Sequence, residues 1–263
     1  MSWDTLLCMS VTCAERTFWW DAGRPADAAF ESLDAVIFDL DGALADVERD
    51  GQRLAFNAAF AEHGLDISWS VEEYGRLVCI GDEQRRIASA LRRRGFGRVS
   101  AEIAAHVYRT KNDLFQDSVL NGDVTPRSGL DDLVNSLYFA AVPVAVVSTG
   151  DRKWVDPLVR QLIGDGIAET IITPDDLARP GREPDLHGHA LWELGLAPER
   201  ALAVAGTPRG LRAARAAKLA TLVVTTGYTA GADFTGAADV RCAYDGLLAA
   251  GCEQLHRKWQ AGR

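Results

Sequence analysis

The sequence predicts an α/β protein, a doubly wound parallel sheet whose chain is interrupted near its start by a block of helices. Three observations lead to this prediction. Short apolar runs alternate with amphipathic segments over the second half of the chain, which is typical of parallel strands joined by right-handed crossover helices. An apolar run at residues 35–38 ends in two acids, Asp39 and Asp41. Between these regions, residues 47–121 carry apolar side chains at helical spacing throughout.

The acidic pair after the first run is the most informative local feature. Residues 35–38 are typical of a strand buried on both faces. Asp39 and Asp41 alternate with Leu40, so in an extended strand their side chains leave on one face, toward the crevice where open α/β sheets bind ligands. Two acids there repel each other unless a cation or a shared proton separates them. This favours a functional site over an exposed acidic turn closed by Gly42.

The remaining elements follow from the same periodicities. We expect further strands at residues 142–147, 170–173, 201–205 and 221–225, and helices at residues 154–163, 186–194 and 208–218. The chain therefore divides into an N-terminal extension (1–32), a core (33–46 and 122–250), an inserted helical domain (47–121) and a C-terminal tail (251–263) that is helical or frayed.

Composition excludes several classes of function. A net charge of −9 argues against a nucleic-acid-binding or anionic-membrane surface. No apolar run approaches the roughly 20 residues that span a bilayer. The one stretch that resembles a signal-peptide core, residues 6–14, lacks a basic start, so we expect a cytoplasmic protein. The five cysteines are scattered and form no CxxC, which is typical of reduced thiols and not of a disulfide framework or zinc site.

The segment FDLDGALAD, residues 38–46, is similar to the first motif, DxDGTLxD, of the haloacid dehalogenase (HAD) superfamily. Residues 48–57 and 73–75, with the late segments 225–229 and 233–237, resemble the CbbY-type branch, which is related to β-phosphoglucomutase. The likeness runs from about Leu33 to the C-terminal region. It implies a HAD core with an inserted α-helical cap, and a hydrolase that acts on a phosphate ester.

The resemblance also implies roles for the acidic pair. Asp39 would attack phosphorus and become an aspartyl phosphate, while Asp41 would protonate the leaving oxygen and later activate water. Both are the candidate magnesium ligands. The second motif supplies a hydroxyl group for the phosphoryl oxygens, which implies Ser148, with Thr149 beside it. Alternatively, Ser148 only caps the helix that begins near Arg152.

The third motif of the family, KPxPD, lacks its lysine. Alignment on Pro184-Asp185 puts Gly181 at the lysine position, and no lysine exists between Lys153 and Lys218. Arg182 is a candidate replacement, although a guanidinium is a planar fork and not a compact charge. It can equally be an exposed loop arginine.

The fourth motif, EDSxxG, lacks both acids, which are replaced by Ala205 and Gly206. Magnesium takes oxygen ligands and typically needs one or two carboxylates besides the phosphate, so we expect its binding to be weak or absent unless Asp175 or Asp176 supplies a ligand. Arg209, near the start of the following helix, can hold an anion there without metal.

Glu48 and Tyr74 match polar positions of the CbbY-type pattern, which makes them candidates for contacts with a sugar phosphate. The alternatives are packing for Tyr74 and a solvated helix face for Glu48. Two functions therefore stay open. The first is a HAD-like hydrolase that acts weakly on a small sugar phosphate through Asp39 and Asp41. The second is an impaired relative that binds a phosphorylated metabolite or a protein partner.

Overall fold

The computed structural model describes residues 30–177 and 184–262, so most of the expected extension lies outside the described residues. Within them, one parallel sheet has the strand order β3-β2-β1-β4-β5-β6. Its strands are β1 (Ala35–Asp39), β2 (Val144–Val147), β3 (Ala168–Ile172), β4 (Ala201–Ala205), β5 (Ala220–Val224) and β6 (Asp239–Arg241). The chain winds from β1 outward to β3 and then returns to β4 on the other side, which confirms the doubly wound sheet.

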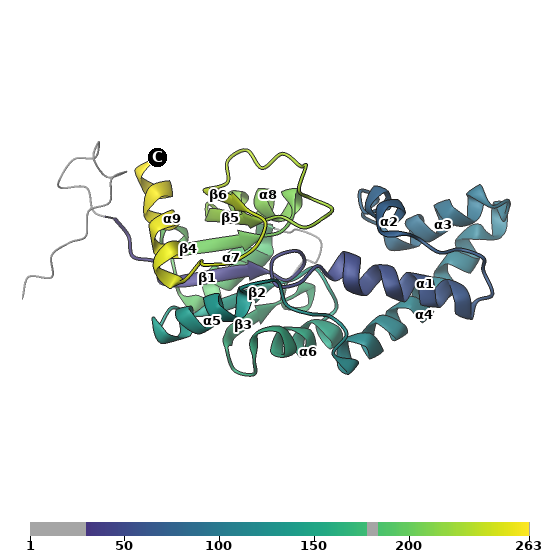
Figure 1. Cartoon of the computed structure of the whole chain (residues 1–263), viewed down its shortest axis with the longest axis horizontal. Helices are drawn as coiled ribbons and strands as arrows, with labels where there is room; N and C mark the ends of the chain where they lie inside the picture. The colour runs from purple at the N-terminus through teal and green to yellow at the C-terminus, as the bar shows by residue number, and fades with distance from the viewer. Residues whose placement is uncertain (1–29, 178–183, 263) are drawn as a thin grey trace, which may run out of the picture.

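The helices fall into two groups in Figure 1. The first group follows β1 and comprises α1 (Arg53–Glu62), α2 (Val71–Leu77), α3 (Glu83–Arg93) and α4 (Ser100–Asn121). The second group surrounds the sheet and comprises α5 (Leu130–Phe139), α6 (Arg152–Ile163), α7 (Pro184–Leu194), α8 (Pro208–Ala216) and α9 (Ala249–Ala261). The first group extends away from the carboxyl end of β1 and buries an aromatic cluster of its own around Phe56 and Tyr74. Within the described residues, no helix is both long enough and apolar enough to cross a membrane.

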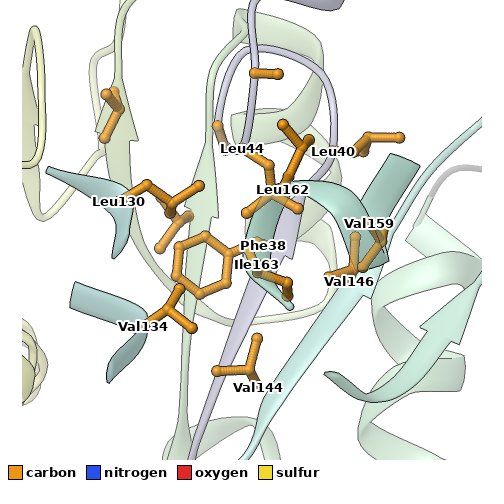
Figure 2. Close-up of a cluster of buried hydrophobic side chains, with 14 of the residues drawn as sticks. Phe38, Leu40, Leu44, Leu130, Val134, Val144, Val146, Val159, Leu162 and Ile163 are labelled. Atoms are coloured by element: carbon orange, nitrogen blue, oxygen red, sulfur yellow. The ribbon is translucent and has the colours of Figure 1, made fainter. Parts of the chain in front are cut away.

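The two faces of β1 pack against different helices. Val36 and Phe38 belong to a cluster with residues of α5, α6 and α9. Figure 2 shows Phe38 in this cluster with side chains of α5 and α6, among them Leu130, Val134, Leu162 and Ile163. Ala35 and Ile37 belong to a second cluster with residues of α7 and α8. Because side chains alternate along a strand, Asp39 leaves β1 on the face of α7 and α8.

Some expectations about the elements need correction. β1 ends at Asp39, and Asp41 lies in the following turn, where it forms an isolated bridge with Ala45. The two acids therefore do not share a face of one strand. Helix α5 and the three-residue strand β6 were not expected, and the segment after residue 250 belongs to α9, whose Cys252 and Leu255 are part of the sheet's apolar core.

Candidate active site

The predicted motifs after β1, β2 and β4 meet at one edge of the sheet. Asp39 is in register with Val147, the last residue of β2, and Phe38 is in register with Val204 of β4. Ser148 and Gly206 therefore leave the sheet on either side of the acidic turn. This is the point where the strand order reverses, and it is where open α/β sheets place their ligands. Gly181 and Arg182 of the third motif lie outside the described residues.

The side chain of Asp39 lies between α7 and α8. His187 of α7 brings its Nε2 to 3.2 Å from Asp39 Oδ1, and the two side chains are 3% and 15% exposed. On the other side, a Cβ built on Gly210 of α8 would meet Asp39 Oδ2 at 1.8 Å, so only glycine leaves room for this carboxyl group. The sequence reasoning missed His187. The only available signal was a histidine two residues beyond Pro184-Asp185, at the edge of the incomplete third motif.

Asp41 has the properties of a proton donor at neutral pH. Burial, reinforced by the negative charges of Glu48, Asp46 and Asp39, raises the pKa of Asp41 to about 8. Its Oδ1 accepts a hydrogen bond of 3.4 Å from the backbone N–H of Glu48, which lowers the pKa and opposes part of the rise. A carboxyl group that keeps its proton near pH 7 can protonate a leaving oxygen.

Asp46 supports the chain after the acidic turn. It stands before a single turn of π-helix, Val47–Gln52, and its Oδ1 accepts a hydrogen bond of 3.3 Å from the backbone N–H of Arg49. A π-helical turn in this position carries Glu48 from the acidic turn toward the helices of the inserted block. Such turns are often found at functional sites.

Glu48 joins the acidic turn to the helical block through a buried network. The Tyr74 hydroxyl donates to Glu48 Oε2, and Arg86 Nη1 lies 3.1 Å from the same oxygen. The side chains of Arg86 and Glu48 are 3% and 21% exposed. Burial lowers the pKa of the Arg86 guanidinium, but Glu48, Tyr74 and Glu83 together more than offset this, and the net pKa is raised.

The network changes how the two candidate sugar contacts are interpreted. Tyr74 is fully buried and packs against Phe56 and Trp69, so it is part of the core of the helical block. Glu48 is ion-paired and half-buried, which contradicts the alternative of a solvated helix face. Contact of either side chain with a substrate stays a prediction. Arg86 is a third member of this group that the sequence reasoning did not single out.

Ser148 does not cap the helix that follows it. Asp151 caps α6, because its side chain accepts a hydrogen bond of 2.9 Å from the backbone N–H of Lys153. The Ser148 Oγ instead accepts a hydrogen bond of 3.1 Å from the backbone N–H of Gly150, which leaves its own hydrogen for another acceptor. Thr149 is exposed.

At the fourth motif, the backbone of Gly206 is in direct contact with the backbone of Gly42. A Cβ built on Gly206 would lie 2.3 Å from both the Cα and the carbonyl carbon of Gly42, so the acidic turn packs directly on the chain after β4. The acid that the family pattern has at this position cannot be accommodated without moving the turn. Arg209 lies beyond it, exposed in the first turn of α8.

Of the two expected substitute ligands, Asp176 is engaged in other interactions. Asp176 accepts a hydrogen bond of 2.7 Å from the backbone N–H of Thr173 and is ion-paired with Arg152. Asp175 is exposed, and its role as a ligand stays untested. Over residues 30–177 and 184–262, no group of three or more His, Cys, Asp or Glu side chains could hold a metal ion. HAD phosphatases generally use magnesium.

Comparisons with known proteins agree with this geometry. The sequence profile of haloacid dehalogenase-like hydrolases matches residues 33–218. Protein CbbY of Cereibacter sphaeroides is 35% identical over 208 residues, which cover 78% of this chain and 90% of that protein. A CBBY-like protein of Arabidopsis thaliana is 32% identical over 212 residues, which cover 77% of this chain and 66% of that protein. The structure of a CbbY variant from Rhodobacter sphaeroides in complex with xylulose-(1,5)bisphosphate matches with a TM-score of 0.69 and 31% identity, covering 84% of this chain and 99% of that chain.

Proposed function

The chain belongs to the haloacid dehalogenase-like hydrolase family, and we propose that it is a phosphatase that acts on a small sugar phosphate through Asp39 and Asp41. The observation that carries the proposal is the position of the two acids. Asp39 ends β1 at the strand-order reversal of the sheet, and Asp41 lies in the next turn, joined to the helical block through the backbone of Glu48. This arrangement supports roles as nucleophile and proton donor, because both acids lie at the same edge of the sheet.

The proposed chemistry takes two steps. In the first, an oxygen of Asp39 attacks phosphorus, the bond to the sugar oxygen breaks, and Asp41 gives that oxygen its proton. In the second, Asp41 takes a proton from water, and the resulting hydroxide attacks the aspartyl phosphate to release inorganic phosphate and restore Asp39. The raised pKa of Asp41 supports its part, since the carboxyl group is protonated when the ester arrives.

The substrate class follows from the relatives and from the charges near the acidic turn. A related CbbY binds xylulose-(1,5)bisphosphate, a small ketose phosphate. In this chain Glu48 can accept hydrogen bonds from sugar hydroxyls, and Arg86 fixes its orientation. We propose a sugar phosphate of this size, with Ser148 and Arg209 as candidate contacts to the phosphate, and with Thr149 and Arg182 as further candidates on adjoining loops.

The same proposal includes a weak requirement for magnesium. Because Asp41 keeps its proton near pH 7, Asp39 is the ionised member of the acidic pair, and the backbone contact between Gly42 and Gly206 supports the view that a further acid is not accommodated. If magnesium binds, Asp39 and Asp41 would hold it, and it would neutralise phosphoryl oxygens. The mechanism above depends only on side chains of this chain.

Phosphate release tests the function directly. The purified protein would be incubated with a generic phosphate ester and with a panel of sugar phosphates that includes xylulose 1,5-bisphosphate, with and without magnesium. We expect slow release that prefers a sugar phosphate and is lost in Asp39→Asn. Asp50→Asn is the matched control, because Asp50 is a half-exposed acid in the same turn region, and it should retain the parent rate. No release from any ester, together with measurable binding of phosphate, would favour the alternative of a binding protein.

A further inference from the structure

We propose that a ring N–H of His187 binds the phosphoryl group that the Asp39 carboxyl group carries during the reaction. The inference rests on the proposed function and extends it by one residue. It starts from the position of α7, which follows directly from the third motif, since Pro184-Asp185 are the first two residues of this helix. His187 lies on the first turn, at the end of α7 that faces the carboxyl edge of the sheet.

The two sides of Asp39 are occupied differently. Gly210 closes the Oδ2 side, where there is no room even for a methyl group. His187 Nε2 lies 3.2 Å from Oδ1 on the other side. The oxygen beside His187 is therefore the one with a polar neighbour that can donate a hydrogen bond. A phosphoryl group carried by Oδ1 would bring its own oxygens within reach of the same N–H.

The hydrogen bonding of His187 points to a missing acceptor. Although its Nε2 is close to Asp39, the geometry is not that of a hydrogen bond, and within the described residues neither ring nitrogen has a hydrogen-bond partner. Buried polar groups are nearly always paired in folded proteins. Leu186 and Ala190, on the same helix, belong to a buried apolar cluster. The unpaired His187 ring is therefore suited to donate a hydrogen bond to an oxygen of a bound ligand.

The role requires an N–H and not a fixed charge. One ring nitrogen of histidine carries a hydrogen whether the ring is neutral or protonated, so His187 can donate in either form. A donor of this kind orients the nucleophile and binds a phosphoryl oxygen, but it neutralises less charge than a lysine. This fits an enzyme that works slowly without the complete family motifs.

Three variants separate this role from simple packing. His187→Phe keeps an aromatic ring among apolar neighbours and removes both nitrogens. His187→Gln keeps an N–H donor of similar reach. His189→Phe is the matched control on the same helix, because His189 is 26% exposed and faces Glu193 instead of Asp39. For each protein, binding of inorganic phosphate is measured by calorimetry, kcat and KM are measured on a generic phosphate ester, and the melting temperature is recorded.

We expect His187→Phe to weaken phosphate binding and to lower kcat by about ten- to a hundred-fold, the range for one hydrogen bond to a charged group. His187→Gln should recover part of both, and His189→Phe should match the parent. His187→Phe should melt no lower than the parent, because it removes an unpaired buried polar group. A structural role would instead lower the melting temperature and leave kcat per folded molecule unchanged.

The outcomes distinguish this inference from the proposed function. If the parent hydrolyses esters and His187→Phe matches it in kcat and phosphate affinity, the role of His187 is refuted and the phosphatase function stands. If the parent binds phosphate but hydrolyses nothing, and His187→Phe weakens that binding, the hydrolase is refuted while His187 remains a phosphate ligand. A parent that neither binds phosphate nor hydrolyses esters refutes both.

Discussion

Replacement of Gly210 by alanine should separate activity from stability. Gly210 lies in the first turn of α8, where alanine normally stabilises a helix by about 0.5–1 kcal/mol relative to glycine. Here the new Cβ would lie 1.8 Å from Asp39 Oδ2, and real Cβ contacts are essentially never shorter than 3.0 Å. The carboxyl group must therefore retreat by at least about 1.2 Å. A displacement of about 1 Å can cost roughly a hundred-fold in rate, because attack on phosphorus depends on alignment.

We therefore expect Gly210→Ala to lose about two orders of magnitude in kcat while its free energy of unfolding stays within about 1 kcal/mol of the parent. Rotation of the short Asp39 side chain relieves the clash at little cost to folding. Gly188→Ala is the matched control, since Gly188 is a helical glycine of α7 with open space around its Cβ position. Gly188→Ala should be more stable than the parent, as alanine is in a helix, and should keep the parent's kcat. Phosphate release and urea unfolding are measured on all three proteins. Unchanged turnover in Gly210→Ala would refute the position assigned to the nucleophile.

Three further predictions concern the acidic turn and its support. The pKa of Asp41 rises from 3.8 to about 8 on folding, so its proton stabilises the folded state fully below pH 3.8, and this contribution is lost as pH rises toward 8. Turnover of the parent should fall above about pH 8, and Asp41→Asn should abolish turnover. The same variant should raise the free energy of unfolding more at pH 8 than at pH 5, and equal effects at both pH values would contradict this. Arg86→Met leaves Glu48 without its ion-pair partner and should lower the free energy of unfolding in urea by about 2–4 kcal/mol. The control Arg85→Met, at an exposed position, should lower it by less than about 0.5 kcal/mol. Similar losses in the two variants would argue against a buried ion pair. Gly206→Asp should destabilise the fold by at least about 1–3 kcal/mol, because the new Cβ meets the Gly42 backbone. The variant should not bind magnesium tightly in calorimetry, and tight binding would show that the turn can move.

The order of elements was predictable because local patterns determine it. Each buried strand of the sheet is a short apolar run, and each covering helix from α6 to α8 shows apolar residues at helical spacing. Helix α5 has the same pattern, with Leu130, Leu133, Val134 and Leu137 at i, i+3, i+4 and i+7, so the signal for it was present and not used. Strand β6 has only three residues, which is too short for an alternating pattern to be recognised.

The candidate site was predictable only in part. Motif spacing identified Asp39 and Asp41 and pointed to the strand ends after β2 and β4. It could not show that Asp41 leaves the strand, because the end of β1 depends on hydrogen bonds to its neighbours. It also gave no reason to connect Arg86 with Glu48, since the contact joins helix α3 to the turn after β1 across 38 residues of sequence.

The sequence by itself determined the family and the sheet and predicted the two acids, since these depend on periodicity and on residues close together in the chain. The tertiary structure alone decided what surrounds them. His187 approaches Asp39 because α7 packs on the face of β1 from which Asp39 projects. Position 206 has no room for a side chain because the acidic turn after β1 lies against it. Such contacts join segments more than 140 residues apart, and only the packing of helices on the sheet brings their atoms together.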